Sequence, residues 1–138
     1  MSVIFKDSDH FYNVLLPFFD RIKADPVMWP KIKNSGLTVQ FRYSDPDAVI
    51  TIDCPKEEII RGEIEGMTPV VVMSMKADTA HKFWLGKLSL MVALTKRDII
   101  AKGPIASIMK LLPVIKDSFP MYNDYLREIG MESAIDFK

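Results

Sequence analysis

The sequence has very little cysteine, no long apolar run and no start of the kind that directs secretion. Its single cysteine, Cys54, excludes an internal disulfide and suits a reducing compartment, so we expect a cytoplasmic protein. No unbroken apolar run approaches the roughly 20 residues that a membrane-spanning helix needs. The first residues, MSVIFKDSDHFYN, do not combine a charged region with an apolar one, so we expect no secretory signal.

Net charge is also lacking. The chain has 18 basic and 18 acidic residues, and no basic block stands out. Nucleic acids and anionic membranes attract proteins through a positive field. We therefore expect no nucleic-acid partner, and the sequence gives little sign of an attraction to anionic membranes.

Residues that carry chemistry are scarce as well. Two histidines and one cysteine are too few for a structural zinc site, and we expect no metal and no cofactor. Cys54 has no catalytic motif around it and is interpreted as a small packing residue. His81 is expected to be partly exposed and without a catalytic role. The glycines lack the spacing of a phosphate-binding loop. Together these absences predict that the protein is not an enzyme.

Apolar residues, in contrast, are abundant. They make up 49% of the 138 residues, and nine of them are methionines. Methionine fills irregular gaps in a core and also suits surfaces that adapt to different guests. The length corresponds to one domain, covering residues 1–138. The apolar supply between Met73 and Ile115 raises the question of whether it serves a core alone.

The first half of the chain predicts a helix followed by strands. Apolar residues recur at helical spacing over residues 11–22, after the candidate caps Asp7, Ser8 and Asp9, and Pro17 should kink or divide this helix. In LTVQFRYS (37–44) apolar and polar residues alternate, which indicates a strand with one face in water. Three further stretches predict strands: AVITIDC (48–54), IIRGEIEG (59–66) and PVVVMSM (69–75).

The second half predicts mainly helices. KLSLMVALT (87–95) is apolar almost all round, so we expect a helix buried against apolar material on two sides. RDIIAKG (97–103) predicts a last strand, and PIASIMKLL (104–112) predicts a helix that Pro113 ends or bends. A closing helix follows over residues 118–130. We expect its tyrosine hydroxyls at a wet edge and the helix to act as a lid.

This order of elements predicts an α+β fold. Helices, antiparallel strands and further helices with one late strand form a sheet of about five strands with helices on one face. No repeat or flexible linker divides the chain.

Three short motifs in the second half resemble the sterol carrier protein domain family. They are Gly86-Lys87-Leu88, Lys102-Gly103 and Lys110-Leu111, which lie in the order turn, strand end and amphipathic helix. The stretch GLTVQFRYSDPDAVITID resembles the first hairpin of the family, so the resemblance covers roughly residues 10–126.

The resemblance implies a curved, largely antiparallel sheet with helices on one face that enclose an apolar tunnel. Members of the family bind sterols, fatty acids or fatty acyl-CoA there without catalysing a reaction. The same is expected of this chain: a non-catalytic lipid carrier that needs no cofactor. We expect Trp84 beside the tunnel and Trp29 away from it. The predicted ligand-binding residues are Met73, Met75, Phe83, Trp84, Leu88, Met91, Leu94, Ile105, Ile108, Met109, Leu112, Ile115, Phe119, Tyr122 and Leu126.

Two other classes stay open. The chain could be an enzyme or an accessory subunit of a lipid-metabolising enzyme, for which Ser74, Ser107 and Tyr122 are the polar candidates, none with a base expected beside it. Alternatively it could be an interaction module that uses an apolar face to bind a partner or to form a homodimer. A transient membrane or enzyme partner is left open in either case.

Overall fold

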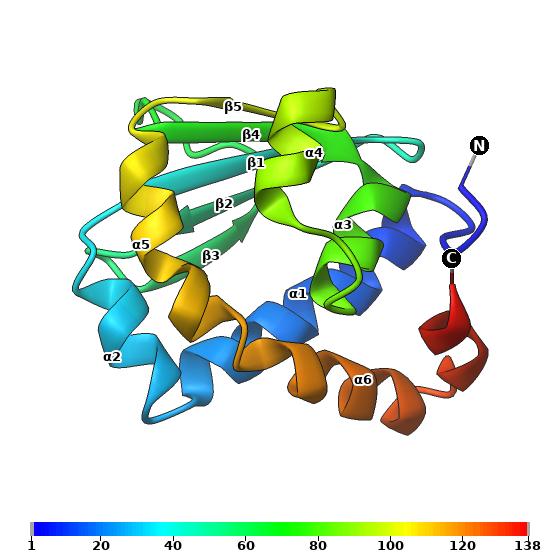
Figure 1. Cartoon of the computed structure of the whole chain (residues 1–138). Coiled ribbons are helices and arrows are strands. Elements are labelled where there is room, and N and C mark those ends of the chain that lie inside the picture. The colour runs from blue at the N-terminus through cyan, green and yellow to red at the C-terminus, as the bar shows by residue number, and fades with distance from the viewer. Residues whose placement is uncertain (1, 138) are drawn as a thin grey trace.

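The computed structural model describes residues 2–137, which form a five-stranded sheet with helices on one of its faces (Figure 1). The strands are β1 (Thr38–Ser44), β2 (Ala48–Asp53), β3 (Glu58–Arg61), β4 (Val71–Lys76) and β5 (Ile99–Lys102). The helices are α1 (Ser8–Ala24), α2 (Met28–Lys33), α3 (Ala77–Trp84), α4 (Leu90–Lys96), α5 (Ile105–Ile115) and α6 (Ser118–Glu128), followed by a short 3-10 helix, η1 (Glu132–Asp136). The predicted α+β class is confirmed.

The sheet is mixed rather than purely antiparallel. Its order is β3-β2-β1-β4-β5, and β1 runs parallel to β4 with Phe41 beside Met73, whereas the other neighbours are antiparallel. A parallel neighbour cannot be joined by a tight turn and needs a crossover. Here the chain leaves β1 through the β2–β3 meander and returns to the other side of β1. The sheet is thus built around β1 and β4.

Neither of the two prolines that were expected to kink or divide the first helix and to end or bend α5 interrupts its helix. Helix α1 is continuous through Pro17, and α5 continues past Pro113 to Ile115. Both prolines lie on exposed helix faces, where water can bond the carbonyl that loses its N–H partner. The predicted cap of α1 is confirmed, because Asp7 Oδ1 accepts a hydrogen bond of 2.8 Å from the backbone N–H of His10.

The outer face of the sheet is partly covered by the segment 62–70. Thr51 Oγ1 donates a 2.7 Å hydrogen bond to the carbonyl of Gly62, and the N–H of Val70 donates to Thr38 Oγ1 at 2.9 Å. Gln40 and Thr51 are therefore buried, although the alternation of the sequence predicted a wet face. The third strand is also shorter than expected, since β3 ends at Arg61.

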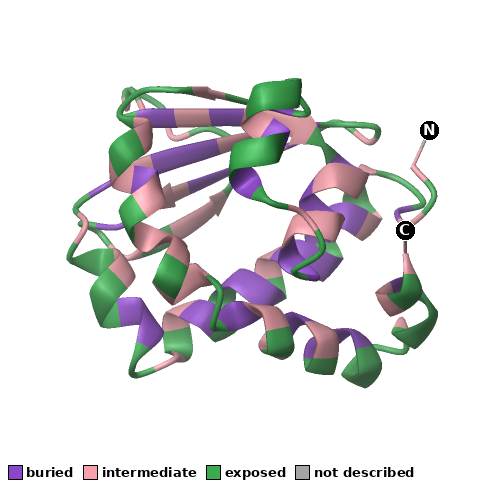
Figure 2. Ribbon diagram, in the orientation of Figure 1, coloured by how far each residue is buried: buried purple, intermediate pink, exposed green. Residues whose placement is uncertain are grey.

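Buried apolar side chains form two clusters (Figure 2). The first joins α1, α3 and α6 to β1 and β2, and includes Phe11, Phe18 and Tyr122. The second joins β1, β4 and β5 to α4 and α5, and includes Val71 and Ile108. Helix α5 spans the region between them, with its ends close to α2 and α6. The seam between the two clusters is where the functional site lies.

A glycine at the end of β5 is required by close backbone packing. Gly103 has φ +109°, and a Cβ built there would lie 2.2 Å from the carbonyl oxygen of Val70. We expect Gly103→Ala to lower the free energy of unfolding by about 3 kcal/mol or more, because both the backbone conformation and the contact are unfavourable. Urea unfolding followed by circular dichroism measures the loss.

Gly66→Ala is the matched control for this substitution. Gly66 also has a positive φ, +77°, but a Cβ there meets no atom within 4 Å. We expect a loss of only about 1–2 kcal/mol at this position. Equal losses in the two variants would show that the contact with Val70 contributes nothing.

Candidate functional site: an apolar cavity

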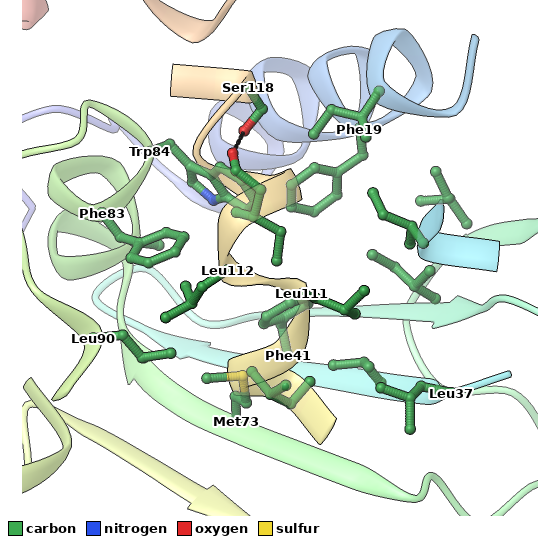
Figure 3. Close-up of a pocket in the computed structure, with 18 of the residues that line it drawn as sticks. Phe19, Leu37, Phe41, Met73, Phe83, Trp84, Leu90, Leu111, Leu112 and Ser118 are labelled. Atoms are coloured by element: carbon green, nitrogen blue, oxygen red, sulfur yellow. Dashed lines mark hydrogen bonds between the residues drawn. The ribbon is translucent and has the colours of Figure 1, made fainter. Parts of the chain in front are cut away.

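An apolar cavity lies between the sheet and the helices, in the seam between the two clusters (Figure 3). Its volume is about 110 Å³, which is more than the roughly 10–15 Å³ that one water molecule needs. The lining residues are Phe19, Ile22, Met28, Trp29, Ile32, Leu37, Val39, Phe41, Tyr43, Ile52, Cys54, Ile59, Met73, Met75, Ala80, Phe83, Trp84, Leu90, Ile99, Ile108, Leu111, Leu112, Ile115 and Ser118.

The floor of the cavity comes from alternate residues of the central strands. On β1 the side chains of Val39, Phe41 and Tyr43 point inward, as the period of two requires. Met73 and Met75 do the same on the parallel neighbour β4. The floor is thus made of branched, aromatic and thioether side chains, and the two methionines give it an adaptable centre.

Helix α5 forms the opposite wall. Ile108, Leu111, Leu112 and Ile115 recur at helical spacing and all line the cavity, and Figure 3 shows Leu111 and Leu112 on the side of α5 that faces it. Among the eleven residues of α5 only Ile108 is fully buried. The other three are half-buried despite being strongly apolar. A guest in the cavity would bury these side chains further. Apolar contact with α5 would therefore contribute to the free energy of binding.

Two of the polar groups at the cavity wall, on Ser118 and Trp29, have hydrogen-bond partners. Ser118 Oγ donates to the carbonyl of Ile115 at 2.6 Å, which is the dashed bond in Figure 3. Trp29 Nε1 donates to Glu57 Oε1 at 2.8 Å. Burial raises the pKa of the Cys54 thiol, which keeps it protonated and unreactive near neutral pH. The cavity therefore offers apolar contact and no group poised to react.

No metal site is found within residues 2–137, where no three His, Cys, Asp or Glu side chains gather to hold an ion. In the same part of the chain no helix is long and apolar enough to cross a membrane. Ser74, one of the polar candidates, faces the outer side of the sheet rather than the cavity.

The structure brings some of the predicted site residues to the cavity and leaves others away from it. Those that line it are Met73, Met75, Phe83, Trp84, Ile108, Leu112 and Ile115. Those that are absent from its wall are Leu88, Met91, Leu94, Ile105, Met109, Phe119, Tyr122 and Leu126. Whether any of them binds a ligand stays a prediction.

Helix α4 differs most from expectation. It was predicted to be buried on two sides, but Met91 is 56% exposed and Val92 is 46% exposed. The helix has seven residues and begins only at Leu90, after the cap Ser89. Only Leu90 and Ala93 are fully buried, and Leu90 alone of the helix lines the cavity. The prediction of two-sided burial was wrong, because a helix of only about two turns rests on β5 with one side and leaves its other side in water.

Most of the lining residues that the sequence analysis missed lie in the first half of the chain, on α1 and α2, which include Phe19, Met28 and Trp29, and on or near β1 to β3. The others, in the second half, are Ala80, Leu90, Ile99, Leu111 and Ser118. Trp29 was expected away from the site, yet it lies on the cavity wall like Trp84. The alternation of LTVQFRYS was the available signal, since Leu37, Val39, Phe41 and Tyr43 all prove to be lining residues.

Helix α6 belongs to the first cluster and does not have the wet edge expected of a lid. Tyr122, Tyr125 and Leu126 are all buried. The hydroxyl of Tyr125 donates to the carbonyl of Val14 at 2.7 Å. The hydroxyl of Tyr122 lies 2.7 Å from His81 Nδ1, so this tyrosine does have a base beside it, contrary to expectation. The pair lies in the core and not at the cavity.

His81 is fully buried, although it was expected to be partly exposed. Its Nε2 lies 2.9 Å from the carbonyl of Ala134, which can only accept, so Nε2 carries the proton. Nδ1 then accepts from Tyr122. This neutral tautomer joins α3, α6 and the C-terminal η1. Burial lowers the pKa of His81 below its usual value, because the imidazolium would be desolvated.

The buried histidine predicts a loss of stability in mild acid. Below about pH 6.5 the unfolded chain binds a proton at His81 that the folded chain does not bind. The free energy of unfolding should therefore fall as pH decreases from 6.5 towards the lower folded pKa, by at most about 1.4 kcal/mol per pH unit. Urea unfolding at about pH 7 and about pH 5.5 measures this dependence.

Two variants separate His81 from other groups that titrate. His81→Gln should flatten the pH dependence between these two conditions, although it also lowers stability at both. His10→Gln, the only other histidine, should keep the dependence of the wild type. The interpretation fails if His81→Gln and wild type lose equal stability on acidification.

Comparison with known proteins identifies the fold. No family model matches the sequence, and no curated protein matches it. Sterol carrier protein 2 from Yarrowia lipolytica, in its apo form, superposes with a TM-score of 0.63 at 11% identity, over 86% of this chain and 95% of that one. The UbiJ-SCP2 ubiquinone synthesis protein gives 0.57 at 8% identity, over 80% and 89%.

Palmitated SCP2L2 from Aedes aegypti, solved by NMR, superposes with a TM-score of 0.55 at 19% identity, over 83% of this chain and 95% of that one. At such low sequence identity, these structural similarities show only that the fold is shared. They agree with the resemblance carried by the short motifs of residues 86–111. The chain has the fold of the sterol carrier protein 2 domains.

Proposed function

We propose that this protein is a non-catalytic carrier of a hydrophobic molecule that contains a long acyl chain. The observation that carries the proposal is the cavity, whose wall is almost entirely apolar and where Trp29 Nε1 and Ser118 Oγ are already hydrogen-bonded. An apolar void of this kind stays dry and accepts apolar guests. The palmitated state of the Aedes protein, which shares the fold, supports a fatty acyl guest. The single, buried Cys54 supports a cytoplasmic location.

Among the expected guests, a fatty acid or fatty acyl-CoA fits better than a sterol. A flexible acyl chain can adapt to the side chains around this cavity of about 110 Å³ more readily than a rigid four-ring sterol can. The palmitated Aedes protein with the same fold also supports an acyl chain.

The energetics of such a guest are sufficient without directed polar contacts. Burying about 400 Å² of apolar surface at about 25 cal/mol per Å² gains roughly 10 kcal/mol. The loss of motional freedom removes a large part of this gain and leaves a dissociation constant on the order of micromolar. Binding of this strength permits both uptake and release.

The test is to fill the cavity without disturbing the fold. Leu112 lines the cavity from α5 and is half-buried, so Leu112→Trp should occupy the void. We expect palmitate to bind at least about tenfold more weakly, measured by isothermal titration calorimetry, with little change in the melting temperature. Wild type should also bind palmitate more tightly than cholesterol.

Ala106→Trp on the same helix is the control, because Ala106 is exposed and lies outside the cavity. It should bind palmitate like the wild type. If Leu112→Trp binds palmitate with unchanged affinity, or if the wild type does not bind it, the cavity is not the site of an acyl chain.

A second candidate function is that of an accessory or interaction module. The exposed Met91 and Val92 favour it, and so does the shared fold of the UbiJ-SCP2 ubiquinone synthesis protein. Native mass spectrometry separates the two functions. A carrier should appear as a monomer with co-purified lipid, which denaturation releases. A lipid-free dimer that Met91→Ser dissociates would favour the module instead.

A further inference from the structure

Charge is strongly segregated along this neutral chain. From residue 79 to residue 116 there are seven basic residues and one acidic residue, Asp98. The remaining residues carry eleven basic and seventeen acidic side chains. The basic residues of 79–116 are mostly separated by apolar ones, with only Lys96 and Arg97 adjacent, which is why no basic block is visible in the sequence. The stretch 79–116, which begins within α3 and runs through α4, β5 and α5, nevertheless has an excess of six positive charges.

Part of this excess gathers around α4. A groove is lined by Lys82 from α3, by Leu88 before α4 and by Arg97 and Asp98 after it, together with Lys76 at the end of β4. Lys76, Lys82 and Arg97 form no ion pair with any residue between 2 and 137. Arg42, which also lines the groove, is paired with Glu63. Three cations therefore remain available there against one carboxylate.

Apolar groups lie exposed on the same helix. Met91 and Val92 are 56% and 46% exposed, and Lys96 follows them on the solvent side of α4. They directly succeed Leu90, which lines the cavity. Figure 1 shows α4 and α5 on the same side of the molecule, in front of the sheet. We call Met91, Val92 and Lys96, with the groove residues Lys76, Lys82 and Arg97, the α4 surface.

We propose that the α4 surface docks on an anionic lipid bilayer. The cations are attracted to the negative surface of the bilayer, and Met91 and Val92 enter its boundary, as apolar groups of interfacial segments do. The charge asymmetry orients the molecule before contact, because the acidic excess lies elsewhere. Docking brings the cavity wall at Leu90 close to the membrane. We assign to docking the purpose of exchanging the guest with the bilayer, and this purpose rests on the proposed function. Docking itself can be measured without a guest.

The observations favour a bilayer over other anionic partners. A nucleic acid is usually held by aromatic rings that stack on bases or by side chains that read base edges. The centre of the α4 surface instead carries a thioether and a valine. A second copy of this chain would place its cations against those of the first, which is unfavourable at low salt. Basic residues around exposed aliphatic ones suit a surface that is negative outside and apolar inside.

The experiment is co-sedimentation with two kinds of vesicle, one of phosphatidylcholine alone and one of equimolar phosphatidylcholine and phosphatidylserine. Wild type should sediment with the anionic vesicles at least tenfold more strongly than with the neutral ones, and high salt should abolish the difference. The charge-reversing pair Lys82→Glu and Lys96→Glu should lose at least tenfold of this binding. The pair Met91→Ser and Val92→Ser should also weaken it.

Matched controls exist elsewhere on the chain. Lys6→Glu with Lys56→Glu makes the same change in net charge at two exposed sites, and Val3→Ser with Val27→Ser removes two valines that are 80% and 60% exposed. Both control pairs should bind anionic vesicles like the wild type. Circular dichroism should show the same fold in all four pairs.

Several results would overturn the proposal. These are equal binding to both vesicle types, equal losses in the test and control pairs, a dimer that the serine pair dissociates while vesicles stay unbound, or binding to a DNA oligonucleotide without binding to vesicles. Palmitate binding from buffer is measured in parallel. If the wild type binds palmitate but does not bind anionic vesicles, docking by the α4 surface is rejected and the carrier function is not. If it binds vesicles but does not bind palmitate, the carrier function is rejected and docking is not.

Discussion

The architecture depends on how the inner face of the sheet is covered. One set of helices packs on β1 and β2, and another packs on β4 and β5, and each set closes its own cluster of apolar side chains. Helix α5 then spans the seam with mainly half-buried residues. Because well-packed interiors leave few voids larger than a water molecule, a space of about 110 Å³ between two complete clusters is a property of the arrangement and not of one poorly fitting side chain.

The two helices that border this seam differ in how firmly they are held. Helix α6 is tied by the Tyr122–His81 and Tyr125–Val14 hydrogen bonds, with its apolar face in the core. Helix α5 has one buried residue and places its other apolar side chains at the cavity wall. Regions with little buried apolar contact open at lower free energy than the core does. Movement that admits a guest is therefore expected from α5, next to the exposed α4.

The properties of the cavity and of the α4 surface both agree with the proposed carrier function. The interior offers apolar contact without a reactive group, and the surface next to it combines cations with exposed methyl and thioether groups. A molecule that carries a hydrophobic cargo must bind it without chemistry and must approach the phase in which that cargo dissolves. Both halves of the chain line the cavity, whereas the α4 surface comes from residues 76–97, in the half that holds the motifs that resemble the sterol carrier protein domains.

Periodicity in the sequence determined which elements form and which face of each is apolar. The alternation of residues 37–44 and the cap at Asp7 were enough for β1 and the start of α1, and the order of elements determined the α+β class. What covers each face was decided only by the tertiary structure, because periodicity is local and the covering elements are distant in the chain. Thus Trp29 reaches the cavity, His81 is buried against Tyr122 and Ala134, and Met91 remains in solvent. The same reason applies to charge: Lys76, Lys82 and Arg97, which follow or belong to three different elements, line one groove only when the chain folds.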